Sequence, residues 1–310
     1  MKKLLFFLTF LSFCVYTFSQ SSDSTVKIND STVKAVKKEK IKRYKVNYWV
    51  TGSIIAVGMV SDYFAIGRLK GKPSMSDEDL AFWNSDAQKD LINSIDQWAL
   101  KQDPSQMTVY KDISDYGQTL TFLLPSLLII DKKIRKDWLD LLLMYVEGHT
   151  ITFTFYNYSP LGPTFQNRWR PIIYYPEVAL DERKSGHNLN SFYSGHTAST
   201  AYSTFFMAKV YSDYHPELKA KKYLLYLAAS VPPLIVGFAR IKALAHFPSD
   251  VAVGLTLGAV IGIVLPELHK NRKFKNFSLG MFESPYGMGL SVGWNLEKIH
   301  PSTESRYNVK

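Results

Sequence analysis

Six apolar segments, separated by polar connections, constrain this chain more than any other feature. They lie at residues 47–66, 117–131, 138–157, 195–213, 223–238 and 249–266. A helix that faces lipid needs about 20 apolar residues to cross a bilayer. The segment at 195–213 carries several Ser and Thr residues, so its polar side must point into a helical bundle. The sequence therefore predicts an all-α fold, a membrane-embedded bundle of about six apolar helices.

The connections between these segments differ in charge. Clusters of Lys and Arg lie at residues 34–45, 132–136, 219–222 and 270–275. In a chain with six spans, all four clusters fall on one side of the membrane. Positively charged loops face the cytoplasm, so the other three connections face outward. These are residues 67–116, 158–194 and 239–248.

The two ends of the chain differ from its centre. Residues 1–19 resemble a secretory signal, and residues 20–45 are predicted to form a disordered, basic arm. The core extends over residues 46–270. Residues 271–310 are predicted to form a small C-terminal β-hairpin and a tail, with a turn around Pro285.

The signal conflicts with the charge rule. A cleaved signal places the mature N-terminus outside, and six spans then place the basic connections outside as well. A secreted, soluble bundle is the alternative that removes this conflict. The mean hydropathy of -0.09 is low enough to allow it. The basic connections favour the membrane protein.

Charge and cysteine content limit the classes of partner. The net charge of +10 favours an anionic partner. We find no basic-aromatic motif of the kind that binds nucleic acid, so lipid headgroups are the favoured partner. The only cysteine is Cys14, which excludes a disulfide framework and a cysteine-based metal site. We expect no metal and no cofactor.

Three polar clusters lie where apolar segments meet the outward connections. The first is the run 167–171, the second is the run 193–196, and the third combines Arg240, His246 and Asp250. Each has an ordinary structural explanation, since Arg-Pro often ends a helix and Ser194 is a good N-cap. Their common location changes that interpretation, because packed helices can bring all three to one pocket.

The residue types in these clusters suit phosphoryl transfer. A phosphate ester reacts slowly because a nucleophile must approach a dianion, so a site needs fixed donors around the phosphate oxygens. Arg170 and Arg240 can supply bidentate guanidinium contacts. Ser194 and the N–H of Gly195 add donors at the start of a helix, where the helix dipole favours an anion.

The two histidines and the aspartate supply the remaining chemistry. A neutral imidazole can attack phosphorus, and we expect His246 to be this nucleophile. Asp250 lies one helical turn further on and is expected to hold the other ring nitrogen as N–H. His196 is then expected to protonate the leaving oxygen and later to activate water.

The three clusters resemble the motifs of the type 2 phosphatidic acid phosphatase and vanadium haloperoxidase superfamily. Its pattern is Lys-x6-Arg-Pro, then Pro-Ser-Gly-His, then Ser-Arg-x5-His-x3-Asp. This chain matches it at Arg170 and Pro171, at Ser194, Gly195 and His196, and at Arg240, His246 and Asp250. The resemblance covers about residues 140–255. It implies an all-α bundle with a metal-free site at one end.

The chain departs from the family pattern at three positions. Pro163 stands where the pattern has its leading Lys, so one phosphate-binding cation is missing unless Arg168, Arg183 or Lys184 replaces it. Among these, Arg168 is the candidate we include with the phosphate-binding residues. Tyr193 replaces a Pro and Ala239 replaces a Ser, and we expect little loss from either change.

The resemblance implies a phosphatase that hydrolyses lipid phosphate or diphosphate esters through a phosphohistidine. The expected substrates are of the phosphatidate, polyprenyl diphosphate or lipid A type. The expected location is the bacterial cytoplasmic (inner) membrane, with the active site facing the periplasm. Three alternatives remain open: a soluble periplasmic nonspecific acid phosphatase on the same scaffold, a vanadium haloperoxidase, and an inactive lipid-binding relative.

Overall fold

A computed structural model of the chain describes residues 42–271, 277–284 and 287–294. The predicted signal at 1–19 and most of the predicted arm at 20–45 lie outside the described residues. The described part is mostly helical, as predicted. The strands β1 (Phe277–Ser284) and β2 (Gly287–Trp294) pair antiparallel with each other.

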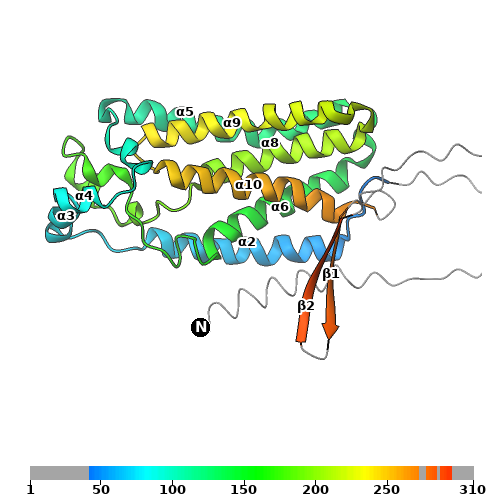
Figure 1. The fold of residues 1–310 in the computed structure, drawn as a ribbon, viewed down its shortest axis with the longest axis horizontal. Helices are drawn as coiled ribbons and strands as arrows, with labels where there is room; N and C mark the ends of the chain where they lie inside the picture. Colours follow the sequence, from blue (N-terminus) through cyan, green and yellow to red (C-terminus); the bar gives the residue numbers. More distant parts are fainter. Residues whose placement is uncertain (1–41, 272–276, 285–286, 295–310) are drawn as a thin grey trace, which may run out of the picture.

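Long helices run side by side along one axis and make up the body of the molecule (Figure 1). Their bounds follow the predicted apolar segments closely, except that α5 begins ten residues earlier than predicted. The long helices are α2 (Tyr48–Lys70), α5 (Met107–Leu123, continued by the 3-10 helix η3, Leu124–Ile130), α6 (Trp138–Tyr158), α8 (Gly195–Tyr214), α9 (Lys222–Lys242) and α10 (Pro248–His269).

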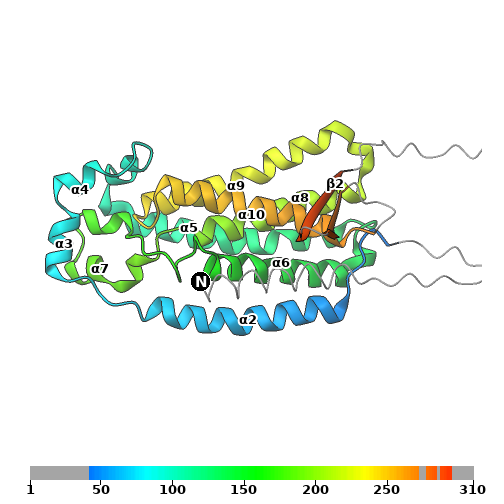
Figure 2. The ribbon, with the colours of Figure 1, turned by 60° about the horizontal axis from the view of Figure 1, so that its bottom comes forward.

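Helix α8 forms the centre of this bundle. It packs against α5, α6, α9 and α10, and most of its side chains are buried. Helix α2 lies on the outside and packs mainly against α6 (Figure 2). The Ser and Thr residues of α8 are therefore covered by protein, as predicted for a segment too polar to face lipid.

Four helices in the described part of the chain are long and apolar enough to cross a membrane. They are α2, the continuous helix from Pro104 to Ile130, the helix from Pro216 to Lys242, and α10. Helices α6 and α8 are not among these candidates, so the prediction of about six apolar helices that span the membrane is not confirmed. Large apolar side chains such as Trp49, Leu120 and Leu227 are exposed on the outer helices, as expected for surfaces that contact lipid.

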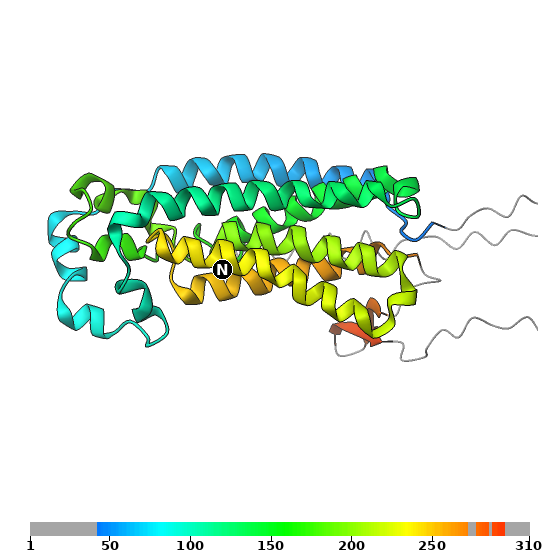
Figure 3. The ribbon, with the colours of Figure 1, turned by 90° about the horizontal axis from the view of Figure 1, so that it is seen from above.

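The two ends of the bundle differ in composition. One end carries the α8–α9 connection, the start of α6 and the end of α10, and the basic clusters at 132–136 and 219–222 lie there (Figures 1 and 3). The other end carries the short helices α3 (Asp77–Trp83), α4 (Asp86–Asp90) and α7 (Leu180–Lys184). The 3-10 helices η1 (Asp96–Leu100), η2 (Pro104–Gln106), η5 (Pro171–Tyr174) and η6 (Gly186–Leu189) belong to the connections of this second end.

Candidate active site

The three sequence clusters meet at the end of the bundle that carries the short helices. Backbone hydrogen bonds connect them. The N–H of Arg170 donates to the carbonyl of Asn188 at 2.8 Å, and the N–H of Ser194 donates to the carbonyl of Asp250 at 3.0 Å. The second bond joins the start of α8 to the start of α10, so the second and third clusters are held together directly.

His246 lies in the short connection between α9 and α10 and is 2% exposed. Its Nδ1 lies 2.6 Å from the backbone carbonyl of Ser191. A carbonyl can only accept a hydrogen bond, so Nδ1 must carry the proton and Nε2 is left with its lone pair. Burial, together with the guanidiniums of Arg170 and Arg240, lowers the pKa of His246 well below its usual value. The ring is therefore neutral at neutral pH.

The acceptor at Nδ1 differs from the prediction. Asp250 Oδ2 lies 3.7 Å from this nitrogen, too far for a hydrogen bond. Asp250 is fully buried at the start of α10 and accepts from Ser191 Oγ at 2.6 Å, from the Phe247 N–H at 2.8 Å, and from Arg168. Asp250 thus positions Ser191, whose carbonyl fixes the tautomer of His246. It also caps the N-terminus of α10.

Ser194 caps the N-terminus of α8. Its side chain is fully buried, and its Oγ bonds to Thr197 Oγ1 at 2.8 Å and accepts from the Thr197 N–H at 3.4 Å. The capping function suggested by the sequence is therefore present. Gly195 follows as the first residue of α8, where the positive end of the helix dipole favours an anion.

Arg170 and Arg240 are the two cations with unused hydrogen-bonding capacity. The Nε of each is buried without a hydrogen-bond partner among the described residues. Arg240, near the end of α9, donates to Ser114 Oγ at 3.2 Å and lies 3.6 Å from Asp115. Burial lowers the pKa of Arg170. Buried guanidinium donors without partners are costly unless a ligand satisfies them.

His196 lies in the first turn of α8, and its Nε2 is 3.0 Å from Asp115 Oδ1. Asp115 belongs to α5, in the part of that helix that the sequence did not predict. The same carboxylate lies near Arg240, so Asp115 connects the predicted acid-base histidine with one of the predicted phosphate-binding arginines.

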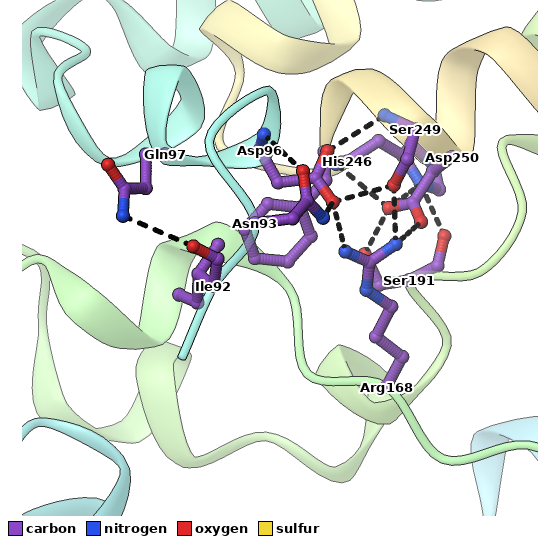
Figure 4. Close-up of polar contacts among 10 residues, drawn as sticks. Ile92, Asn93, Asp96, Gln97, Arg168, Ser191, His246, Ser249 and Asp250 are labelled. Carbon is purple, nitrogen blue, oxygen red and sulfur yellow. Dashed lines mark hydrogen bonds and ion pairs between the residues drawn. The ribbon is translucent and has the colours of Figure 1, made fainter. Parts of the chain in front are cut away.

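Arg168 is placed differently from the other two arginines. Its Nη2 donates to Asp96 Oδ2 at 2.6 Å, and its Nη1 donates to Asp250 and to Ser249 Oγ (Figure 4). Its guanidinium also lies over the ring of Phe247, 4.3 Å from the ring centroid. Two carboxylates already satisfy its charge, which leaves it poorly suited to bind a phosphate.

The other suggested replacements for the missing Lys are also engaged elsewhere. Arg183 donates to the carbonyl of Ile173 at 2.9 Å, and Lys184 pairs with Asp77 at 3.0 Å. Pro163 itself is contacted by Lys72, whose Nζ donates to the Pro163 carbonyl at 2.7 Å. That ammonium also donates to Asn167, so it fastens the connection after α6 rather than facing a ligand.

Sequence reasoning missed three residues of this site: Ser191, Asp96 and Asp115. Ser191 contributes its backbone carbonyl. Every residue has this group, so the residue type does not indicate the contact. Asp96 and Asp115 lie 72 and 81 residues before their partners Arg168 and His196. No local spacing pattern connects residues so far apart. Within the described ranges, no group of His, Cys, Asp and Glu is arranged to hold a metal ion.

Comparison with known proteins agrees with the motif pattern. Residues 138–274 match the model of the PAP2 superfamily. A solved structure, the first transmembrane PAP2 type phosphatidylglycerolphosphate phosphatase from Bacillus subtilis, is similar at 20% identity and a TM-score of 0.40. The match covers 69% of this chain and 93% of that one. No curated protein matches the chain. The part of the chain that matches the PAP2 superfamily model, residues 138–274, contains all three motifs.

Proposed function

We propose that this protein is a phosphatase that hydrolyses lipid phosphate or diphosphate esters through a phosphohistidine on His246. The observation that carries the proposal is the hydrogen bond from Nδ1 of this buried ring to the Ser191 carbonyl. That bond leaves the Nε2 lone pair free to attack phosphorus. Arg170 and Arg240 are close enough to contribute to the lowered pKa of the ring, which supports their proposed role as phosphate-binding cations.

The reaction has two steps. In the first, the Nε2 lone pair of His246 forms a bond to phosphorus as the ester P–O bond breaks, and His196 gives a proton to the leaving oxygen. In the second, a water molecule attacks phosphorus and gives a proton to His196. The P–N bond breaks with its electron pair returning to Nε2, and inorganic phosphate leaves. Both histidines end in their starting protonation states.

The remaining residues stabilise charge. Arg170 and Arg240 bind the equatorial phosphate oxygens, and the N–H of Gly195 donates to the same oxygens from the start of α8. Asp115 accepts a hydrogen bond from His196 Nε2, which leaves Nδ1 to exchange protons with the leaving group and with water. Asp115 also favours the imidazolium form in which His196 begins and ends the cycle.

An aromatic cluster near the pocket supports a lipid substrate. Trp98 and Tyr110 each contact Phe238, with ring centroids 5.7 and 6.3 Å apart, and Lys242 lies over the rings of Tyr110 and Phe238. Aromatic and basic side chains gather where spanning helices leave the hydrocarbon core. Arg240 lies between Phe238 and Lys242 in the sequence, so the phosphate site is at the level of lipid headgroups.

The charge distribution supports an orientation. The basic clusters at 132–136 and 219–222 lie at the end of the bundle opposite the site (Figure 1). Positively charged loops stay in the cytoplasm. We therefore place the protein in the bacterial cytoplasmic membrane with its active site facing the periplasm.

The test is hydrolysis by the purified protein in proteoliposomes. Phosphatidate, a polyprenyl diphosphate and lipid A serve as substrates, and His246→Ala is compared with His215→Ala, the same change at the opposite end of the bundle. We expect His246→Ala to lose several powers of ten in rate and His215→Ala to stay active. The wild type should also accumulate an acid-labile phosphohistidine on rapid quenching. Near-normal turnover by His246→Ala would overturn the mechanism, and no hydrolysis of any of the three lipids by the wild type would overturn the function.

A further inference from the structure

The connection between α4 and α5 makes polar contacts with the active site through the side chain of Asp96. Asp96, the first residue of η1, is fully buried although it belongs to an exposed connection. Its carboxylate accepts from Arg168 Nη2 at 2.6 Å, from Ser249 Oγ at 2.7 Å and N–H at 2.9 Å, and from Asn93 Nδ2 at 2.6 Å (Figure 4). This segment lies outside the part of the chain that matches the family model.

These contacts keep Asp96 charged. Burial alone would raise its pKa, but the hydrogen bonds from Ser249, Arg168 and Asn93 outweigh burial and lower the pKa below its usual value. A buried carboxylate with four donors is held in one orientation, because any rotation leaves a donor or an oxygen without a partner.

Arg168 transmits this fixed position toward the catalytic histidine. Its two terminal nitrogens bind two carboxylates on different elements, Asp96 through Nη2 and Asp250 through Nη1. A planar guanidinium held at both nitrogens cannot turn without breaking one of the two pairs. The ring of Phe247, below the guanidinium, limits its movement further.

The chain of contacts then continues to His246. Asp250 accepts from Ser191 Oγ at 2.6 Å, and the carbonyl of Ser191 accepts from His246 Nδ1 at 2.6 Å. Asp96 is thus linked to the reacting imidazole through Arg168, Asp250 and Ser191 by short polar contacts only. Figure 4 shows these residues around a common centre, drawn from three separate parts of the chain.

We propose that Asp96 is a positioning residue of the active site: by fixing Arg168 it holds Asp250 and the Ser191 carbonyl where they keep Nε2 of His246 aimed at phosphorus. The inference rests on the proposed function for the reaction that this geometry serves. A loop that merely needed an anchor would require no contact with the catalytic carboxylate. Here Asp96, which anchors the connection, and Asp250 both bind the guanidinium of Arg168.

The central variant is Asp96→Asn, which keeps the shape of the side chain and removes its charge. Asp103→Asn is the matched control. It makes the same change seven residues later in the same connection, where Asp103 is exposed and caps η2 by accepting from the N–H and Oγ of Ser105. We expect Asp96→Asn to lower kcat about 10- to 100-fold with little change in KM, because a misplacement of about 1 Å costs on this scale. Asp103→Asn should match the wild type.

A second variant tests the same link from its other side. Arg168→Gln should also lower kcat. It should in addition move the acidic limb of the rate profile to higher pH, because Arg168 is one of the cations that lower the pKa of His246. The double variant Asp96→Asn with Arg168→Gln should be about as slow as the slower single variant, since both changes break one link. The double variant removes the charge at both positions, so neither one faces an unpaired charge at the other. It therefore allows the same test if Asp96→Asn alone does not fold.

The pH readout depends on every charged group that faces the ring. These groups are Asp250, Arg168, Arg170, Arg240 and His196. Of these five groups, only Arg168 is substituted in the variants. A shift of the acidic limb in Arg168→Gln therefore reports the loss of its charge. A purely structural role for Arg168 would leave the limb in place.

Vanadate binding, followed by vanadium NMR, gives a readout that does not need turnover. Vanadate takes the geometry of the transition state, so a displaced imidazole should bind it less tightly. We expect at least a tenfold weaker affinity in Asp96→Asn and none of this loss in Asp103→Asn. Equal kcat and equal vanadate affinity in the two variants would overturn the positioning role while leaving the proposed function intact. A wild type that binds vanadate but hydrolyses no lipid phosphate would overturn the function, and the affinities would still decide the role of Asp96.

Discussion

Close packing of α10 on α8 should control the distance between His196 and His246, the two proposed catalytic histidines. Gly254, Gly258 and Gly262 face α8 at four-residue intervals, so that a Cβ at Gly258 would lie 2.1 Å from the Ala198 carbonyl oxygen. Real Cβ atoms essentially never approach another atom within 3.0 Å. Gly258→Ala must therefore push the two helices apart by about 1 Å, because neither backbone can rotate away like a flexible side chain.

That displacement acts on catalysis directly. His196 lies half a turn before Ala198 on α8, and His246 lies just before α10. A shift of about 1 Å between catalytic groups costs on the order of 100-fold in rate. Forcing a methyl group into a filled interface also costs about 1–3 kcal/mol of stability. We expect Gly258→Ala to remain folded with a lower melting temperature and a kcat about 100-fold below that of the wild type.

The assay is steady-state hydrolysis of a lipid phosphate in nanodiscs, with melting followed by circular dichroism. Gly52→Ala is the control, because a Cβ at Gly52 has no neighbour within 4 Å. It should change neither kcat nor melting. A Gly258→Ala enzyme with wild-type kcat would refute the reasoning, since the helices would then accommodate the methyl group without moving the catalytic residues.

Three further predictions follow from the site and the fold. The rate kcat/KM, corrected for ionisation of the substrate, should not fall between pH 7 and about 6, because burial and the nearby arginines lower the pKa of His246 and the neutral ring is lost only well below its usual value near 6.5; an acidic limb at pH 6.5 or above would contradict this. Activity should survive EDTA and be inhibited by micromolar vanadate, and reversible loss on chelation would instead indicate metal-assisted hydrolysis. A cysteine at Glu182 should react with an impermeant maleimide in intact spheroplasts, while one at Lys221 should react only after permeabilisation; Cys14 is the only native thiol, and the reverse pattern would place the site in the cytoplasm.

Local patterns in the sequence were sufficient to predict most of the helical architecture. Apolar runs located the long helices to within a few residues, because burial or lipid contact requires continuous apolar surface. The start of α5 was missed because Met107–Tyr116 contains several polar residues, including Ser114 and Asp115. Those side chains face the active site rather than lipid, so the same contacts that give this stretch its function hide it from an apolar pattern.

The predicted site residues come together, but their detailed contacts were beyond the sequence. The motifs identified which residue types meet, since their spacing is local to each cluster. They did not identify the Ser191 carbonyl as the partner of His246, because a backbone group leaves no mark on residue identity. The motifs also did not show that Arg168 and Arg170, which are two residues apart, differ in their binding partners. That difference depends on Asp96, which a distant connection brings to Arg168.

The division between these arginines has a consequence for reactivity. Asp96 and Asp250 neutralise Arg168, whereas Arg170 and Arg240 keep buried Nε groups without partners among the described residues. Their positive field attracts an anion and, in addition to the larger effect of burial, lowers the pKa of His246, so one pair of charges contributes to both tasks. A bound phosphate dianion would offset the part of this lowering that comes from the two arginines, so the pKa of His246 should rise although burial still holds it down. The imidazole therefore becomes more basic, and hence more nucleophilic, once the substrate is in place. On the proposed mechanism, burial and these charges keep the nucleophile unprotonated in the resting enzyme, and the substrate then offsets the charges.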